Sequence, residues 1–227
     1  MKLSMTHSEQ PAAVPWPDPQ RKSDFERWLA PLAAQHRLAP ETLRAASADA
    51  SFRRYLRIDS SSRGPSLIVM DAPPPQEDVR PFVKVAQLMQ QAQLHGPQVL
   101  AADVERGFLL LTDLGRTLYL DAFAEASPKQ ADALMRDAIA ALVRWQCRVP
   151  GAELPPYDEA MLRRELQLFP DWCVAREHGV TWDAAQQQTW QQVSDKLVAA
   201  ALAQPRVAVH RDWMPRNLMV AEPNPAI

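Results

Sequence analysis

The sequence is poor in cysteine and contains no long apolar run. Its two cysteines, Cys147 and Cys173, form neither a CxxC pair nor a disulfide framework. The first ten residues, MKLSMTHSEQ, lack the apolar core of a signal peptide. No stretch reaches the roughly 18 apolar residues that a membrane-spanning helix requires. We therefore expect a reducing cytoplasmic location and no membrane partner.

Lysine is also scarce, because only five of the 25 Lys and Arg residues are lysines. These cations nearly balance 27 Asp and Glu residues and leave a net charge of -2. This balance gives no reason to expect nucleic acid or an anionic membrane as a partner. Since the other twenty cations are arginines, any phosphate-binding clamp is expected to be built from arginine.

Several catalytic motifs are absent as well. The sequence has neither a GxSxG elbow nor a Walker loop, which argues against a hydrolase and a P-loop enzyme. His210 and Asp212 have no third His or Cys at ligand spacing, so a zinc site is not expected. The 227 residues, 47% of them apolar, suffice for one large domain or two small lobes around a shared cleft.

The first half of the sequence predicts strands around one main helix. Proline-rich residues 1–20 are expected to form a mobile arm, and a helix follows from the capping-box pair Ser23 and Glu26. Alternating and apolar runs predict two hairpins, formed by residues 51–58 with 66–71 and by residues 98–104 with 108–114. A helix from Asp78 separates the hairpins, because apolar residues recur there at three- and four-residue spacing.

The second half predicts mostly helices. Pro128 begins a long helix, and a further helical stretch at 158–178 is bent or broken at Pro170. Thr181 begins another helix, and residues 207–210 and 217–220 predict two short strands around a polar loop. The pattern therefore indicates a β-rich lobe at 21–114 and a helical lobe at 115–227. A cleft between two such lobes is a natural ligand site.

The polar loop reads HRDWMPRN (210–217) and has the HxDxxxxN outline of a kinase catalytic loop. Asp212 supplies the carboxylate that orients an acceptor hydroxyl and takes its proton. Asn217 supplies an amide oxygen that binds Mg²⁺ without adding negative charge. His210 is expected to hold the loop in place. The alternative is a chance match of three letters in a polar loop, against which the flanking strands and the late position argue.

Together with SFRRYLRI, LIVMDAPPPQED, GFLLLTDLG and ELQLFPDW, this loop resembles the aminoglycoside phosphotransferase-like kinases. Within them, the sequence is most similar to bacterial kinases that phosphorylate N-acetylmuramate and N-acetylglucosamine at the anomeric carbon. The resemblance covers roughly residues 24–222. It implies an α+β, protein-kinase-like fold with a five-stranded lobe and a mostly helical lobe. It also implies ATP and Mg²⁺ as cofactors and a role in cell-wall sugar recycling.

The resemblance also implies where the nucleotide binds. The hairpin at 51–71 covers ATP, and backbone groups near Thr112, Asp113 and Leu114 meet adenine. The stretch AASADASFRRY has no glycine, so phosphates are expected near Ser51 and Phe52 without a glycine-rich loop. Met70 stands near the position of the usual phosphate-binding lysine. Its replacement could be Arg53, Arg54, Arg57 or Lys84, although the arginines could equally form a solvated strand face.

A second Mg²⁺-binding aspartate is implied shortly after Asn217, but residues 218–227 contain only one carboxylate, Glu222. We therefore expect the chain to be cut off within its helical lobe. The loss of a metal ligand removes several kcal/mol of transition-state stabilisation, so the isolated chain is expected to be inactive or very weak.

The acceptor is expected to be a small sugar that meets Glu165, Trp172, Arg211 and Arg216. Trp172 can stack on a sugar face, but it can also be a core residue, and Glu165 and Arg216 can be plain surface charges. Other acceptors remain open: an aminoglycoside, choline or an amino alcohol. A non-catalytic, kinase-like binding module is a further alternative. The oligomeric state is left open.

Overall fold

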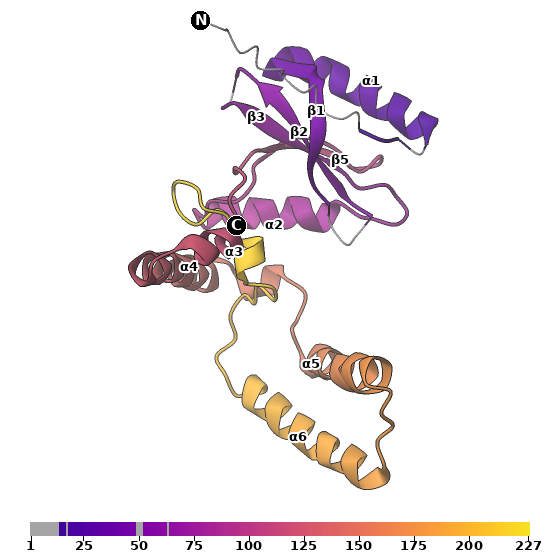
Figure 1. The fold of residues 1–227 in the computed structure, drawn as a ribbon, viewed down its shortest axis with the longest axis vertical. Coiled ribbons are helices and arrows are strands. Elements are labelled where there is room, and N and C mark those ends of the chain that lie inside the picture. The colour runs from indigo at the N-terminus through magenta and orange to yellow at the C-terminus, as the bar shows by residue number, and fades with distance from the viewer. Residues whose placement is uncertain (1–13, 17, 49–51, 63) are drawn as a thin grey trace, which may run out of the picture. The chain divides into compact units, whose positions relative to one another are not determined.

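Figure 1 shows the fold of the computed structural model, which describes residues 14–16, 18–48, 52–62 and 64–227. The chain forms two compact units: residues 1–141 with 213–227, and residues 142–212. The expected lobe boundary after residue 114 stays a prediction. The expected arm lies mostly outside the described residues, but Pro19 and Gln20 already belong to a helix. In the described part of the chain, no helix is long and apolar enough to cross a membrane.

A five-stranded antiparallel sheet organises the first unit. Both predicted hairpins are confirmed, and the five-stranded sheet agrees with the fold that the resemblance implies. The first strand of the sheet is not among the expected ones. The strands are β1 (Leu38–Ala48), β2 (Arg54–Ser60), β3 (Ser66–Asp71), β4 (Val99–Asp103) and β5 (Phe108–Thr112), in the order β1-β2-β3-β5-β4.

Each face of the sheet packs against one helix (Figure 1). Ile58, Val69 and Phe108 are fully buried on the face that packs against α1 (Pro19–His36). On the opposite face, Met70 and Leu109 are fully buried in a cluster that includes side chains next to and within α2 (Arg80–Gln91). Because successive residues of a strand point to opposite faces, the central strands β3 and β5 are apolar at almost every position.

Two helices follow the sheet. They are α3 (Tyr119–Glu125) and α4 (Pro128–Arg148). Tyr119 and Ala138 form a buried cluster with Leu218, whose backbone carbonyl accepts a hydrogen bond from the Tyr119 amide at 2.9 Å. The segment after residue 212 is thereby packed against the start of α3.

The second unit is helical. It contains a short 3₁₀ turn, η1 (Gly151–Glu153), and the helices α5 (Glu159–Leu168) and α6 (Ala184–Leu202). The helical stretch expected at 158–178 is present, and α5 passes without interruption into a π-helix, η2 (Phe169–Glu177). The helix therefore changes its hydrogen-bonding type next to Pro170 and does not break there. Phe169, Trp182 and Trp190 form an aromatic cluster with centroid separations of 5.3 to 6.3 Å.

Two expected helix starts and two expected strands are wrong. The first helix begins at Pro19, where the Asp18 carboxylate accepts the Gln20 amide, and not at Ser23. Helix α6 begins after Asp183, whose capping box with Gln186 replaces the expected start at Thr181. Residues 207–210 and 217–220 do not form strands; in the second segment, Met219 alone makes isolated bridges, with Leu118 and Ala226. A four-residue apolar run forms a strand only where a neighbouring strand completes its hydrogen bonds.

A buried carboxylate joins α1 to the sheet. The Asp71 side chain is 2% exposed and accepts hydrogen bonds from Arg21 Nε and Arg54 Nε at 3.0 Å each. The Arg21 guanidinium lies 3.9 Å above the Phe108 ring and also donates to the Arg106 carbonyl. One carboxylate therefore pairs with two arginines from different elements.

We expect Asp71→Asn to destabilise the fold by about 3–5 kcal/mol, because it leaves two guanidinium groups without their counter-charge. Glu26→Gln, which removes an exposed carboxylate paired with Lys22 on the same helix α1, is the control and should cost less than about 1 kcal/mol. Urea unfolding at pH 7 measures both variants. Equal midpoints for the two variants would contradict the account of Asp71.

Candidate functional site

A hollow in the first unit lies where the chain leaves β5. It has a volume of about 620 Å³. The sheet contributes Arg44, Asp59 and Ser66 to its wall, and the segment after β5 contributes Asp113 to Arg116. The remaining lining residues are Pro65, His95, Ala221 and Glu222. Charged side chains and exposed backbone therefore surround a space of the size of a small-molecule site.

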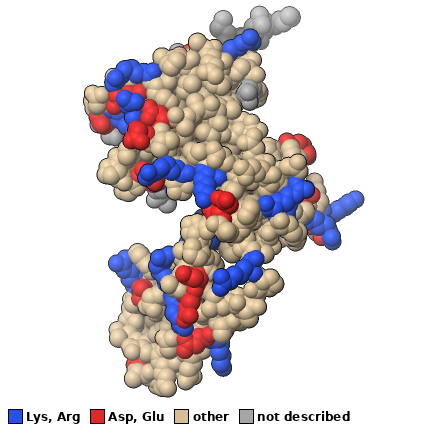
Figure 2. All heavy atoms as spheres, turned by 180° about the vertical axis from the view of Figure 1, so that it is seen from behind, with Lys and Arg blue, Asp and Glu red and all other residues tan. Residues whose placement is uncertain are grey.

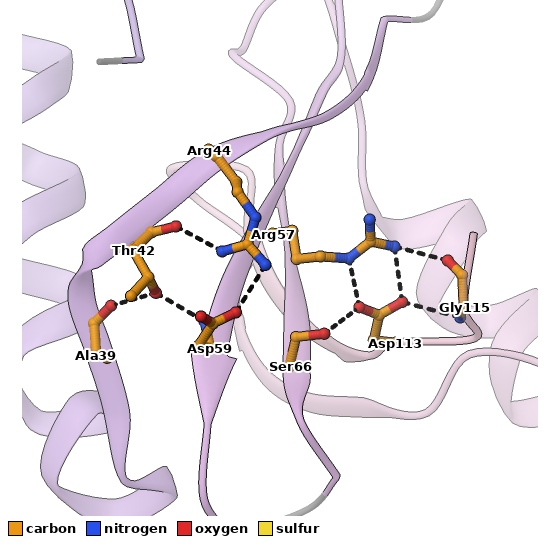
Figure 3. A network of polar contacts seen from close by, with 8 residues as sticks. All are labelled: Ala39, Thr42, Arg44, Arg57, Asp59, Ser66, Asp113 and Gly115. Carbon is orange, nitrogen blue, oxygen red and sulfur yellow. Dashed lines mark hydrogen bonds and ion pairs between the residues drawn. The ribbon is translucent and has the colours of Figure 1, made fainter. Parts of the chain in front are cut away.

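A buried ion pair fixes the segment after β5, which we call the hinge (residues 113–116). Figure 3 shows Arg57 of β2 donating from Nε to Asp113 Oδ2 at 2.5 Å and from Nη2 to Asp113 Oδ1 at 2.9 Å. Asp113 also accepts hydrogen bonds from Ser66 Oγ at 2.6 Å and from the Gly115 amide at 2.9 Å. Arg57 further donates to the Gly115 carbonyl at 2.6 Å. Both charged side chains are at most 10% exposed.

These contacts keep Asp113 ionised. Burial acts to raise the pKa of the Asp113 carboxyl, but hydrogen bonds from Arg57, Ser66 and the Gly115 amide outweigh it, so the pKa is lowered. Both oxygens of the Asp113 carboxylate therefore accept hydrogen bonds from within the protein. These hydrogen bonds hold the hinge backbone against β2 and β3.

A second network forms the sheet side of the hollow (Figure 3). Arg44 donates to Asp59 Oδ1 at 2.7 Å and to the Thr42 carbonyl at 2.8 Å. Thr42 Oγ1 donates to the Ala39 carbonyl at 2.6 Å and accepts from the Asp59 amide at 2.9 Å. The contacts lie at a register shift between β1 and β2, so side chains replace part of the strand pairing there.

The other residues predicted to bind nucleotide lie in different surroundings. Ser51 lies outside the described residues, and Phe52 is 67% exposed. Met70 is fully buried in the cluster beside α2. Thr112 exchanges hydrogen bonds with the backbone of Gln98, and Leu114 lines the hollow. Their roles in binding stay predictions.

The strand arginines are engaged with carboxylates. Arg53 Nε lies 2.8 Å from Glu77 Oε2, while Arg54 and Arg57 pair with Asp71 and Asp113 as described above. The alternative of a solvated strand face is wrong for Arg57, which is 10% exposed, and stays open for Arg53 and Arg54, which are 35% and 30% exposed. Figure 2 likewise shows cationic and anionic side chains lying close together on the visible face. Which of these cations serves a phosphate stays a prediction.

The start of the predicted catalytic loop is anchored within the second unit. The His210 ring packs edge-on against Trp145 of α4, with centroids 5.9 Å apart. Burial lowers the pKa of His210, and the charge of Asp212 offsets this only in part. The imidazole is thus neutral near pH 7, which suits a packed, structural histidine. The Asp212 side chain that follows is exposed.

Glu165 meets the same loop from α5. Its Oε1 accepts a hydrogen bond from Arg211 Nη2 at 2.7 Å, and its Oε2 accepts one from the Tyr157 hydroxyl. The hydrogen bond from Tyr157, followed by that from Arg211, lowers the pKa of Glu165 despite some desolvation. Glu165 is therefore more than a plain surface charge. Nothing in the sequence marks Tyr157 or Trp145 as a partner of the loop.

The end of the loop belongs to the first unit. Pro215–Asn217 form a 3₁₀ turn, η3, in which the Asn217 amide donates to the Met214 carbonyl at 2.9 Å. Arg216 and Asn217 are exposed. Trp213 packs beside the cluster of Tyr119 and Leu218.

Trp172 lies on the π-helix η2 and is 56% exposed, so the alternative of a core residue is wrong. The Arg176 guanidinium lies 4.1 Å above its ring. The exposed Trp172 indole thus makes a cation–π contact with Arg176 on one face.

Asp113 should make the stability of the fold depend on acid. Because its folded-state pKa is lowered, its contribution is present above the unfolded pKa of about 4 and is lost as pH falls through the folded value. Asp113→Asn should therefore destabilise the protein strongly at pH 7 and progressively less below pH 4. Chemical unfolding from pH 7 to 3 tests this, with the exposed Asp132→Asn as control. A gap between wild type and Asp113→Asn that stays constant over this range would contradict it.

Comparison with known proteins points to one family. The model of the phosphotransferase enzyme family matches residues 42–227. The chain is 56% and 54% identical to proteins named N-acetylmuramate/N-acetylglucosamine kinase from Pseudomonas aeruginosa and Pseudomonas putida. The matches cover 83% and 82% of this chain but only 54% and 53% of those proteins. A protein of the same name from Neisseria meningitidis is 41% identical over 92% of this chain and 61% of its own length.

The fold agrees with this match. A solved streptomycin–ATP–APH(2″)-IIa ternary complex superposes with a TM-score of 0.56, at 14% identity, over 95% of this chain and 70% of that chain. The chain thus spans just over half the length of the Pseudomonas relatives and has a kinase-like fold. Since the family model covers most of the sequence, the chain belongs to the phosphotransferase enzyme family.

Proposed function

We propose that the whole protein is an ATP-dependent kinase that phosphorylates the anomeric hydroxyl of N-acetylmuramate or N-acetylglucosamine. The observation that carries this proposal is the 54–56% identity to two relatives named N-acetylmuramate/N-acetylglucosamine kinase. The product, a sugar 1-phosphate, is what nucleotide-sugar synthesis consumes during cell-wall sugar recycling. ATP as the donor accords with the cytoplasmic location expected from the sequence.

In this proposal, Asp212 orients the acceptor hydroxyl and takes its proton. The residue is exposed and follows an anchored, neutral His210, so a substrate can approach its carboxylate. Phosphoryl transfer needs little covalent help from the protein and depends on positioning and charge stabilisation. A fixed carboxylate beside the attacking oxygen provides the positioning.

The proposal assigns Mg²⁺ to Asn217. Mg²⁺ prefers oxygen ligands and commonly takes one or two from the protein and the rest from phosphates and water. The exposed Asn217 amide fits this role. In the part of the chain that the structure describes, no three His, Cys, Asp or Glu side chains gather to hold a metal alone. The second aspartate that the resemblance implies after Asn217 and the phosphates would complete the set. When bound, the ion neutralises charge on the transferred phosphoryl group.

The hollow beside the hinge is the proposed adenine site. Asp113 is fully engaged by Arg57, Ser66 and Gly115, so the base is expected to meet hinge backbone near Thr112 and Leu114. The proposal assigns the phosphates to the segment just before β2, near Phe52 and Arg53. For the acceptor, the exposed Trp172 offers a face for a sugar ring, and Arg216 offers a cation for the phosphoryl group or for the lactyl carboxylate of N-acetylmuramate.

Asp212→Asn should abolish transfer and spare ATP binding. A general base contributes about 10²–10⁴-fold to rate, so turnover should fall by at least about 100-fold. The affinity for ATP should change less than about threefold, because an uncharged side chain of the same shape leaves the adenine site intact. Asp195→Asn on α6, which also removes an exposed carboxylate, is the control and should leave both quantities unchanged.

ADP release by the whole protein with N-acetylmuramate measures turnover, and calorimetry measures ATP binding. Turnover of Asp212→Asn close to that of wild type would refute the assignment of the base. Turnover by wild type with aminoglycosides and none with amino sugars would refute the assignment of the acceptor.

A further inference from the structure

Arg211, the residue before the proposed base, has an uncommon backbone conformation. Its φ of 71° lies in the left-handed region, which a side chain with a Cβ atom enters at a steric cost. Such a conformation persists where surrounding contacts hold it, and it is frequent at functional sites. The contacts that hold the Arg211 side chain therefore also affect where the side chain of the next residue, Asp212, points.

The Arg211 side chain is held by a closed group of three residues, which we call the Glu165 clamp (Tyr157, Glu165 and Arg211). Glu165 accepts one hydrogen bond from each of the other two, on separate oxygens. The Arg211 guanidinium carbon also lies 5.9 Å from the centre of the Tyr157 ring. Each member thus contacts both others, and the three come from the segment before α5, from α5 itself and from the loop.

The residues just before Arg211 are held by packing. His210 lies against Trp145, and Ala208 is buried two residues earlier. The backbone is therefore anchored at His210 by a ring contact and at Arg211 by a charged hydrogen bond. Asp212 is the next residue along the chain.

We propose that Glu165 is a positioning residue, which holds Arg211 in its left-handed conformation and thereby aims the Asp212 carboxylate at the acceptor hydroxyl. The inference rests on the proposed function, since it assigns Asp212 the role of base. It differs from the expectation that Glu165 and Arg211 bind the sugar directly. Both Glu165 oxygens already accept hydrogen bonds from the protein, so the clamp satisfies this carboxylate before any substrate arrives.

Because the clamp is partly exposed to solvent, a positioning role can be distinguished from a role in the stability of the fold. The side chains of Arg211 and Glu165 are 54% and 35% exposed. Exposed ion pairs contribute little to the stability of a fold. Loss of the clamp should therefore leave the melting temperature almost unchanged, whereas misplacement of a catalytic group by about 1 Å can lower turnover about 100-fold.

Glu165→Gln and Tyr157→Phe test the clamp, with Glu159→Gln as the matched control. Glu159 also lies on α5 and pairs with an arginine, Arg163, but does not contact the loop. The first readout is hydrogen exchange of the backbone amides at 209–213 in the free protein. We expect faster exchange there in Glu165→Gln and Tyr157→Phe, unchanged exchange in α6, and wild-type exchange throughout in Glu159→Gln.

The second readout is turnover of the whole protein with ATP and N-acetylmuramate. We expect kcat of Glu165→Gln to fall about 10- to 100-fold, with KM for both substrates within about threefold of wild type. Glu165→Asp, which keeps the carboxylate, should recover part of this loss. Melting temperatures should agree within about 2 °C for all variants, since the exposed pair contributes little to stability.

Two outcomes would overturn the proposal. A raised KM for the sugar with unchanged kcat would make Glu165 a sugar ligand. Loop exchange in Glu165→Gln equal to that in Glu159→Gln would show that the clamp does not hold the loop. If wild type phosphorylates no amino sugar, the proposed function fails; the exchange readout then still decides whether Glu165 holds Arg211, because it needs no turnover.

Discussion

The buried pair of Arg57 and Asp113 is the interaction on which the candidate nucleotide site depends. It joins the middle of β2 to the first residue after β5, and Ser66 and Gly115 complete it. A carboxylate at this depth is tolerable only when it is paired and hydrogen-bonded. Four such contacts fix the hinge backbone, and the hollow of about 620 Å³ takes its shape from that backbone and from the neighbouring pair of Arg44 and Asp59.

The proposed catalytic residues are held by contacts of a different kind. The hinge relies on charges that are almost completely buried, whereas the loop at 210–212 relies on one ring contact and an exposed clamp. The two arrangements suit different tasks. In the proposed function, the hinge binds the adenine base and has to keep one shape. The proposed catalytic carboxylate has to face solvent and substrate and still point in one direction.

Much of the fold follows from the sequence, because β3 and β5 are apolar runs of strand length bounded by turn residues. Strand β1 was missed, since LAPETLRAASA contains a proline and several alanines and is regular only through its pairing with β2. The loop at 210–217 was located by its spacing, but its partners were not. Glu165 precedes Arg211 by 46 positions and Arg57 precedes Asp113 by 56, and no local pattern reveals such pairings. A charged residue inside an alternating apolar strand, as Arg57 is, was the one available signal of a buried pair.

The central proposal is that the whole protein transfers a phosphoryl group to the anomeric oxygen of an amino sugar. Phosphorus NMR of the whole protein with Mg²⁺-ATP and N-acetylmuramate tests it most directly, because coupling to the anomeric proton identifies the phosphorylated position. The account predicts a new phosphate signal coupled to that proton, with matching loss of ATP. A phosphate signal coupled to another sugar proton, or intact ATP with N-acetylmuramate and N-acetylglucosamine alike, would contradict it.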